Sequence, residues 1–543
     1  MKKTLIGFAA LLTAASAVNA QNTFTGPSTG STPYVAPISP LVKVYSIATV
    51  DNTGVNPDDV FTRFNPSSAN GNSTTYGMSG IPDGLGAYDS GNGTFTVLMN
   101  HELGSGVGAT RDHGSAGAFV SKWTINKNTL AVTGAGDLIQ SVVTWNTANS
   151  TYNSPGTTAF ARLCSADLPV VSAFYNSNTS LGTQERIFMS GEETGAEGRA
   201  FAHIVTGSDA GKSYELPRLG KFSWENSVAN PTAQNKTIVI GADDTSNQGQ
   251  VYMYVGNKTS TGNDIEKAGL TNGLLYGVKV EGGAPQQESR TTDFGIGKGN
   301  TKAFSLFNHG NVENTSGNTL NTNSVSNGVS NFLRPEDGAW DPTNGSYFYF
   351  VTTDRYDEVK DNVGAQVGRS RLWRMEFADI ANPENGGNIR LMLDGTEDHQ
   401  MFDNITVDAN GKVLLVEDPG NQARNAKLWE FNPSDSSLTL LAGHDQARFG
   451  NIGVPATLPF TVDEEMSGII EITDLMAGSS LSSGHTGERW FLVDVQAHYI
   501  TGLTTAQVEG GQLLAVQVVP EPSTYALLGL GALALAALRR KKA

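Results

Sequence analysis

Short runs of β-branched and aromatic residues, separated by Gly, Asn and Asp, follow one another from about residue 40 to residue 519. This stretch lacks the pattern typical of long amphipathic helices. One arrangement recurs: an apolar run ends in a carboxylate, and a polar loop leads to a run with an aromatic residue. It occurs at residues 94–102, 186–193, 237–244, 347–354 and 413–418, whereas the run at 490–496 lacks the acidic end. The pattern predicts short strands joined by turns.

The spacing of the acidic ends bears on the architecture. Successive ends are 91, 51, 110 and 64 residues apart, so the units do not repeat regularly. Several four-stranded units over about 480 residues nevertheless predict an all-β fold, an irregular β-propeller. Two stacked β-sandwiches are the main alternative. We expect one domain over residues 21–519, in which the Asn-, Ser-, Thr- and Gly-rich residues 308–330 form an insertion loop.

The composition narrows the range of partners. The 543 residues include 36 Lys and Arg against 53 Asp and Glu, which gives a formal net charge of −17. Only 16% of the residues are charged and 62 are Gly, which argues against helical bundles and coiled coils. An acidic protein lacks the basic face that nucleic acid requires, whereas cations suit its surface. We therefore expect cations as partners and no nucleic acid.

Both ends of the chain carry processing signals. Two lysines precede an apolar run at residues 5–17, and Val18-Asn19-Ala20 precede Gln21. This order predicts a secretory signal peptide over residues 1–20. A transmembrane anchor is the weaker alternative, because the apolar run is short.

The C-terminal segment, residues 520–543, has three parts. Pro520-Glu521-Pro522 precede an apolar stretch at residues 525–538, and four basic residues follow at 539–542. The apolar stretch predicts a short transmembrane helix of about 21 Å. The whole segment resembles the PEP-CTERM sorting signal, which implies an exosortase-type sorting machinery and a Gram-negative envelope. The resemblance also implies transient anchoring in the inner membrane, then release to the cell surface or extracellular matrix.

Familiar catalytic signatures are absent from the sequence. Asn100-His101-Glu102, for example, lacks the second histidine of a zinc-protease motif.

The sequence contains a single cysteine, Cys164, which rules out an intrachain disulfide. Stability must therefore come from core burial, from bound cations, or from both.

Carboxylates at the strand ends are the strongest chemical signal. If the strands radiate around one axis, their acidic ends converge on one mouth, where hard oxygen ligands suit Ca²⁺. The alternative is that each is a solvated acid in a turn. The acids in question are Glu102, Glu192, Glu193, Glu225, Asp243, Asp244, Glu336, Asp337 and Asp418.

Arg334 lies beside two of these acids, in Arg334-Pro335-Glu336-Asp337. A guanidinium suits bidentate recognition of phosphate, so Arg334 is a candidate phosphate-binding residue of a catalytic site. The alternative is a structural ion pair with a carboxylate.

Several motifs resemble those of the PhoX-type calcium-dependent alkaline phosphatases. The Arg334–Asp337 block is the most specific, and the order and approximate spacing of the motifs hold across roughly residues 80 to 500. The other matching blocks are at residues 100–102, 164–165, 191–193, 219–225, 241–244, 341–342, 403–404, with Asp403, and 495–496.

The resemblance implies a six-bladed propeller that hydrolyses phosphomonoesters with several Ca²⁺ ions and an iron pair. By position, the resemblance implies that the metal ligands are Glu193, Glu225, Asp244 and Glu336. It also implies that Arg334 binds the phosphate of the substrate. Together with the strand ends, the expected metal ligands are Glu102, Glu192, Glu193, Glu225, Asp244, Glu336, Asp403 and Asp418.

The sequence departs from the family at three positions. Gly191 replaces a cysteine that binds iron in the family, Lys221 replaces an arginine, and Trp224 replaces a histidine. Cys164 aligns with a different family cysteine, so we expect Ca²⁺ without tightly held iron.

Two functional hypotheses follow. One is an exported Ca²⁺-dependent phosphoesterase that acts on phosphate esters. The alternative is a non-catalytic, cation-stabilised propeller that binds matrix polysaccharide or another component of the cell surface. The retained Arg334 favours the first hypothesis, whereas Gly191 and the sorting segment favour the second.

Overall fold

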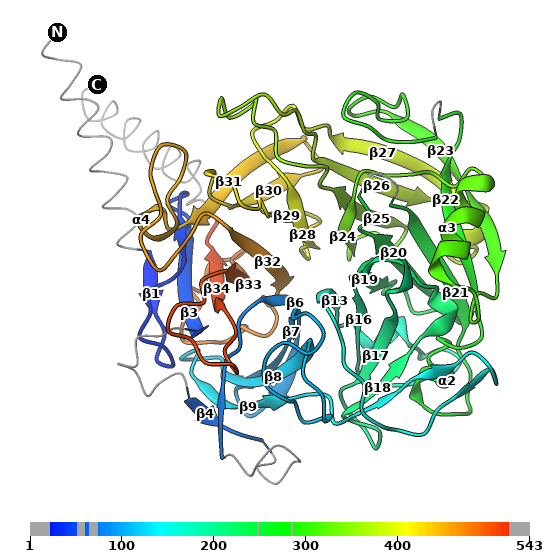
Figure 1. Ribbon diagram of the computed structural model, residues 1–543, viewed down its shortest axis with the longest axis horizontal. Coiled ribbons are helices and arrows are strands. Elements are labelled where there is room, and N and C mark those ends of the chain that lie inside the picture. The colour runs from blue at the N-terminus through cyan, green and yellow to red at the C-terminus, as the bar shows by residue number, and fades with distance from the viewer. Residues whose placement is uncertain (1–21, 51–59, 65–73, 247–248, 284–285, 521–543) are drawn as a thin grey trace, which may run out of the picture.

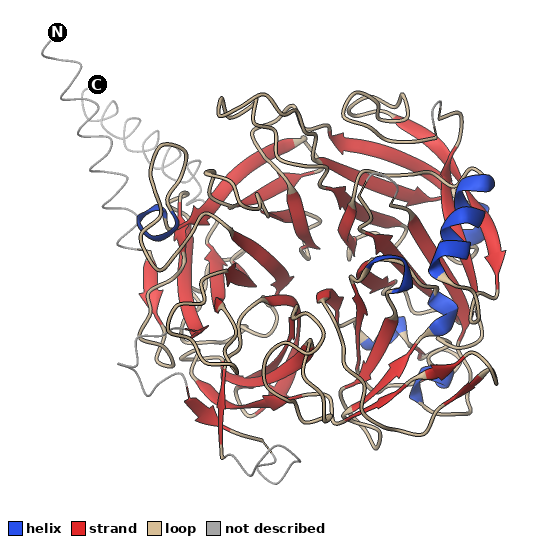
Figure 2. Cartoon of the chain, in the orientation of Figure 1, coloured by secondary structure: helices blue, strands red, loops and turns tan. Residues whose placement is uncertain are grey.

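The computed structural model describes residues 22–50, 60–64, 74–246, 249–283 and 286–520. Strands dominate these residues, and the helices are few and short (Figure 2). The expected signal peptide, and all but Pro520 of the expected sorting segment, lie outside the described residues. Among the residues that are described, none forms a helix with the length and apolar character needed to cross a membrane.

Blades of β-structure surround one central axis (Figure 1). Each described inner strand contacts the next, and the last contacts the first, so the strands close a ring of six. In chain order, which numbers the blades one to six, the inner strands are β6 (Pro82–Gly91), β13 (Leu163–Asp167), β19 (Trp224–Ala229), β24 (Pro335–Trp340), β28 (Phe402–Val407) and β32 (Glu464–Glu471). This confirms the propeller and excludes the stacked sandwiches.

The remaining strands extend each blade outward from its inner strand. Blade one adds β7 (Thr94–His101), β8 (Phe119–Asn126) and β9 (Val132–Asp137); blade two adds β16 (Ile187–Glu192), β17 (Ala200–Ile204), β18 (Lys212–Glu215) and β10 (Ser141–Val143). Blade three adds β20 (Lys236–Asp243), β21 (Val251–Asn257), β22 (Leu274–Val280) and β23 (Thr301–Gly310); blade four adds β25 (Tyr347–Thr352), β26 (Arg371–Phe377) and β27 (Gly387–Leu393). Because β23 pairs with both β22 and β27, blades three and four share one nine-stranded sheet.

The N-terminal strands complete the last two blades. Blade five consists of β28, β29 (Val413–Glu417), β30 (Lys427–Asn432), β31 (Ser437–His444) and β2 (Val35–Pro37). Blade six consists of β32, β33 (Arg489–Ala497), β34 (Gly510–Val518), β3 (Val42–Val50) and β1 (Thr23–Thr25). Since β3 pairs antiparallel with β34, strands from the two ends of the described chain close the ring.

Short elements connect the blades. They are the strand pairs β4 (Val60–Thr62) with β5 (Thr75–Gly77), β11 (Trp145–Asn146) with β12 (Thr151–Tyr152) and β14 (Tyr175–Asn176) with β15 (Leu181–Gly182). The helices are α2 (Asp264–Lys267), α3 (Gly317–Ser326) and α4 (Gln446–Phe449), with 3-10 turns η2 (Val171–Ala173), η3 (Gly195–Glu197), η4 (Pro217–Leu219) and η5 (Pro383–Asn385).

The insertion loop expected at residues 308–330 contains the helix α3, so that expectation is wrong in part. Ser316 caps the helix by accepting a hydrogen bond from the Thr319 backbone N–H at 3.3 Å. Leu320 on the same helix is buried in the core between blades two and three. The cap and the buried leucine thus help to order a segment of polar composition.

Apolar side chains fill the spaces between successive blades. On β7, Val97 packs in the cluster that lies against blade six, whereas Leu98 packs in the cluster that lies against blade two. Strands that are buried on both faces need no strict alternation of apolar and polar residues, which explains the continuous apolar runs in the sequence. The ring is also tight near its axis: a Cβ added at Gly84 would lie 2.3 Å from the backbone nitrogen of Ala166 on the next inner strand.

Candidate metal centre

A β-bulge lies at the start of the inner strand in blades one to five. In blade one, Pro82 pairs with His101 and Leu85 with Met99, so two residues of β6 face one residue of β7. The same shift occurs on β13, β19, β24 and β28. The first residues of these bulges are Asp83, Cys164, Glu225, Glu336 and Asp403. Because bulges re-aim side chains, each of these blades presents one potential ligand at the same level of the axis.

A second set of acids follows the second strand of a blade. Glu102 follows β7, Glu193 comes directly after β16, Asp244 after β20 and Asp418 after β29. These are the acidic strand ends that the sequence predicted. In each blade the second strand pairs with the inner strand, so these acids lie at the same end as the bulges.

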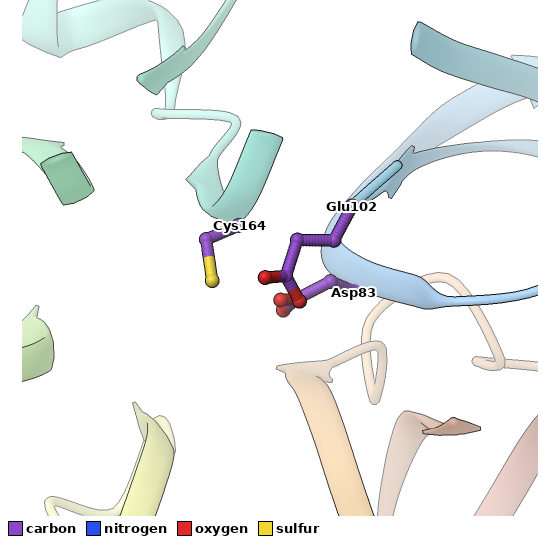
Figure 3. A group of neighbouring side chains, drawn as sticks. All are labelled: Asp83, Glu102 and Cys164. Carbon is purple, nitrogen blue, oxygen red and sulfur yellow. The ribbon is translucent and has the colours of Figure 1, made fainter. Parts of the chain in front are cut away.

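The two sets meet in three overlapping groups of side chains. In each group, one potential ligand atom from every residue lies within 4.8 Å of the others. The groups are Asp83 with Glu102 and Cys164 (Figure 3), Cys164 with Glu193 and Glu225, and Glu225 with Glu336 and Asp403. Because Cys164 and Glu225 are each shared by two groups, the residues form one continuous cluster, which we call the axial cluster.

Electrostatics oppose ionisation of this cluster. Burial, and after it the charge of Glu102, raises the pKa of Glu193 to about 8. Burial also raises the pKa of Glu225 to about 7, although a hydrogen bond from Ser165 acts in the opposite direction. The pKa values of Asp83, Glu336 and Asp403 lie well above the usual range, first because of burial and then because of neighbouring carboxylates. A bound cation would relieve this repulsion, so the donor set fits metal ions.

Two arginines contact the rim of the axial cluster. Arg334 forms a two-pronged contact with Asp244, with both N–O distances at 2.8 Å, and lies 2.9 Å from Glu336. Arg162 pairs with Glu102 at 2.5 Å and with Glu193. Each arginine directly precedes an inner strand and has a positive φ, 46° for Arg162 and 55° for Arg334. This backbone conformation is uncommon for residues other than Gly and is typical of functional sites.

The structure brings most of the predicted ligands together. Glu102, Glu193, Glu225, Glu336 and Asp403 belong to the axial cluster. Asp244 pairs with Arg334, which also pairs with Glu336 of the cluster. Asp418 belongs to none of the three groups, but its negative charge contributes to the raised pKa values of Glu465 and Arg334.

Glu192, also among the expected ligands, belongs to none of the three groups. Its carboxylate pairs with Arg199 at 2.7 Å, because successive residues of a strand point to opposite faces and Glu193 takes the face toward the axis. Asp243 and Asp337 likewise serve local structure: Asp243 accepts hydrogen bonds from Ser223 and Thr245, and Asp337 from Asn226.

Sequence analysis missed Asp83 and misplaced Cys164. The sequence pattern marks acids at the ends of apolar runs, whereas Asp83 lies near the start of an inner strand, in a bulge that leaves no clear sequence signal. The Cys164 sulfur belongs to two groups of the cluster, and burial raises the pKa of its thiol. The cluster therefore contains a thiol, which the alignment of motifs had placed elsewhere.

Packing explains why residue 191 has no side chain. A Cβ added at Gly191 would lie 2.3 Å from the Trp224 Cβ, and one added at Gly241 would lie 2.4 Å from the Trp224 Cζ3. The indole of Trp224 also stacks on Phe222, with ring centroids 3.9 Å apart. Two of the departures from the family pattern, Gly191 and Trp224, are thus in direct contact.

We expect Gly191→Ala and Gly191→Cys to lower the free energy of unfolding by about 1–3 kcal/mol, because the added Cβ overpacks the contact with Trp224. Urea denaturation measures the effect. Gly156→Ala is the matched control, since a Cβ at Gly156 approaches other atoms no closer than 3.9 Å. An equal effect at both glycines would contradict the packing explanation.

Comparisons with known proteins agree with this geometry. Residues 208–453 match the family model of the alkaline phosphatase PhoX, and residues 518–541 match the PEP-CTERM protein-sorting motif. No curated protein sequence matches the chain. Pseudomonas fluorescens PhoX, solved in complex with vanadate, a transition state analogue, is similar in structure, with a TM-score of 0.55 at 11% identity over 88% of this chain and 95% of that one.

A gluconolactonase from Xanthomonas campestris gives a TM-score of 0.30 at 10% identity, over 82% of this chain and 87% of that one. The likeness to PhoX shows the fold. The sorting motif indicates a protein that is exported and sorted to the cell surface. The chain is thus a β-propeller protein that is similar to the PhoX alkaline phosphatases over residues 208–453 and carries a PEP-CTERM sorting motif at residues 518–541.

Proposed function

We propose that this protein is an exported, cation-dependent phosphomonoesterase whose mature chain comprises residues 21–519. The observation that carries the proposal is the axial cluster with Arg334 at its rim, beside a cavity of about 440 Å³. The match to the PhoX family over residues 208–453 supports a phosphate ester as the substrate. In this proposal the protein acts at a Gram-negative cell surface, after transient inner-membrane anchoring through residues 520–543.

The ligand types divide the axial cluster. Glu225, Glu336 and Asp403 offer only oxygen, which suits Ca²⁺. The two groups that include Cys164 combine sulfur with carboxylate oxygen, and a thiolate favours a transition metal such as iron. We therefore propose Ca²⁺ at the first group and a transition metal beside Cys164. Bound cations would neutralise the phosphoryl oxygens and the charge that develops during hydrolysis.

In this proposal Arg334 binds the substrate phosphate. Its guanidinium is held by two carboxylates that are themselves candidates for metal binding. When cations take up Asp244 and Glu336, the planar donor fork of Arg334 becomes available for phosphoryl oxygens. The ion pair and the phosphate contact, which the sequence left as alternatives, can thus be two states of one residue.

We expect Ca²⁺ to raise the melting temperature over that measured in EDTA. Binding to the native state alone stabilises the protein by about 2.7 kcal/mol at a hundredfold excess over Kd. Differential scanning calorimetry of wild type, Glu336→Gln and the control Glu376→Gln, on the third strand of blade four, β26, tests this. Wild type and the control should shift, and Glu336→Gln should shift less; no shift in wild type would refute cation binding.

We expect purified wild type to contain a transition metal that Cys164→Ser loses, because serine offers no thiolate. Elemental analysis of protein purified without chelators measures it. The Ca²⁺-dependent shift in melting temperature should persist in Cys164→Ser, since the oxygen-only group is intact. A wild-type protein with only trace transition metal would refute the assignment beside Cys164.

We expect Arg334→Lys to lower kcat/KM for p-nitrophenyl phosphate by tenfold or more, about 1.4 kcal/mol, because an ammonium cannot make the two-pronged contact. Arg390→Lys, on the outer strand β27, is the control. Circular dichroism should show an intact fold in both variants. Unchanged turnover in Arg334→Lys would exclude its role, and no activity in wild type with metals supplied would refute the phosphomonoesterase.

A further inference from the structure

The cavity beside the axial cluster contains more positive side chains than one phosphate requires. Arg290, Arg334 and Arg355 all line it, together with Glu193, Asp244 and Asp354. Glu193 belongs to the axial cluster and Asp244 is bound to Arg334, so the cavity opens directly beside the proposed catalytic site. Its volume of about 440 Å³ leaves room for a substrate well beyond the phosphate group.

The backbone fixes Arg355 beside Arg334. The Thr353 N–H donates to the Arg334 carbonyl at 3.1 Å, and the Asp354 N–H donates to the Leu333 carbonyl at 3.2 Å. The segment after β25 is therefore tied to the segment before β24 in the same blade, and residue 355 follows directly. This arrangement belongs to the blade itself and does not depend on a bound metal.

The two additional arginines have unused hydrogen-bond donors. Arg355 is exposed, and its guanidinium makes no hydrogen bond or ion pair with any residue that the structure describes. Arg290 pairs with Asp354 at 2.8 Å, but its Nε is buried without a partner among the described residues. A buried donor without a partner is unfavourable, so a ligand that accepts a hydrogen bond from Arg290 would offset part of that cost.

The charges in the cavity also favour an anion. Three arginines face three carboxylates there. Under the proposed function, cations at the axial cluster engage Glu193 and Asp244, which leaves the arginines in excess. An arginine that does not contact the scissile phosphate would be neutralised by a second anionic group on the same substrate.

We propose that Arg290 and Arg355 form a second anion-binding subsite, which selects phosphate esters whose leaving group carries a carboxylate or a second phosphate. This inference rests on the proposed function for the position of the scissile phosphate. Arg334 binds that phosphate, and the subsite holds the second anion on the leaving-group side of the cavity.

The test compares two non-hydrolysable ligands, phenylphosphonate and 4-carboxyphenylphosphonate, by calorimetry in Ca²⁺. Wild type should bind 4-carboxyphenylphosphonate about tenfold more tightly than phenylphosphonate, because one additional charge-assisted hydrogen bond contributes about that factor to the affinity. Arg355→Gln should lose this preference and retain the affinity for phenylphosphonate. Arg390→Gln is the matched control on an outer strand and should behave as wild type. Because Arg355 is exposed, its substitution leaves the core intact.

The outcomes separate the subsite from the catalytic proposal. If wild type shows no preference, or if Arg355→Gln retains it, the subsite is refuted even where phosphomonoesters are hydrolysed. If the preference depends on Arg355 and no ester is hydrolysed, the subsite is supported and the proposed phosphomonoesterase activity is refuted. If the second anionic group is a phosphate, wild type should also bind methylenediphosphonate more tightly than methylphosphonate. Arg355→Gln should lose that preference, and this result would support the subsite as well.

Discussion

The closure of the inner strands into one ring determines what this protein can do. Each of the first five blades places a bulge residue at the axis, and the acids after the second strands add to it. Closure thus collects carboxyl groups in a space from which much of the water is excluded, where their mutual repulsion raises pKa values. Protons, arginines or cations must neutralise them, and the arrangement of the site follows from that requirement.

The arginines and the proposed cations compete for the same carboxylates. Arg162 and Arg334 hold Glu102, Asp244 and Glu336, and do so from equivalent positions before two inner strands. A guanidinium that satisfies a carboxylate in one state can receive a phosphoryl group in another, so ion pairing and anion binding are coupled. The same reasoning extends to Arg290 and Arg355, which have donors that the described protein leaves unused.

The departures from the PhoX pattern have a structural explanation. Gly191 lies too close to Trp224 for any side chain, and sulfur enters the cluster from Cys164 instead. The alignment of motifs could not show this, because Cys164 lies in the bulge of β13 that faces residue 191 on the neighbouring strand β16.

The sequence by itself determined the all-β class and favoured a propeller, because strands buried on both faces produce short apolar runs between turns, whereas the closed ring of inner strands excluded the stacked sandwiches. It also identified the acids that follow the second strands, such as Glu102 and Glu193, since these end an apolar run. Only the tertiary structure decided between Glu192 and Glu193, which depends on the face that each strand turns to the axis. It alone revealed Asp83, the place of Cys164 and the group of arginines around Arg334, because bulges and ring closure join residues from different blades, and no local pattern records that contact.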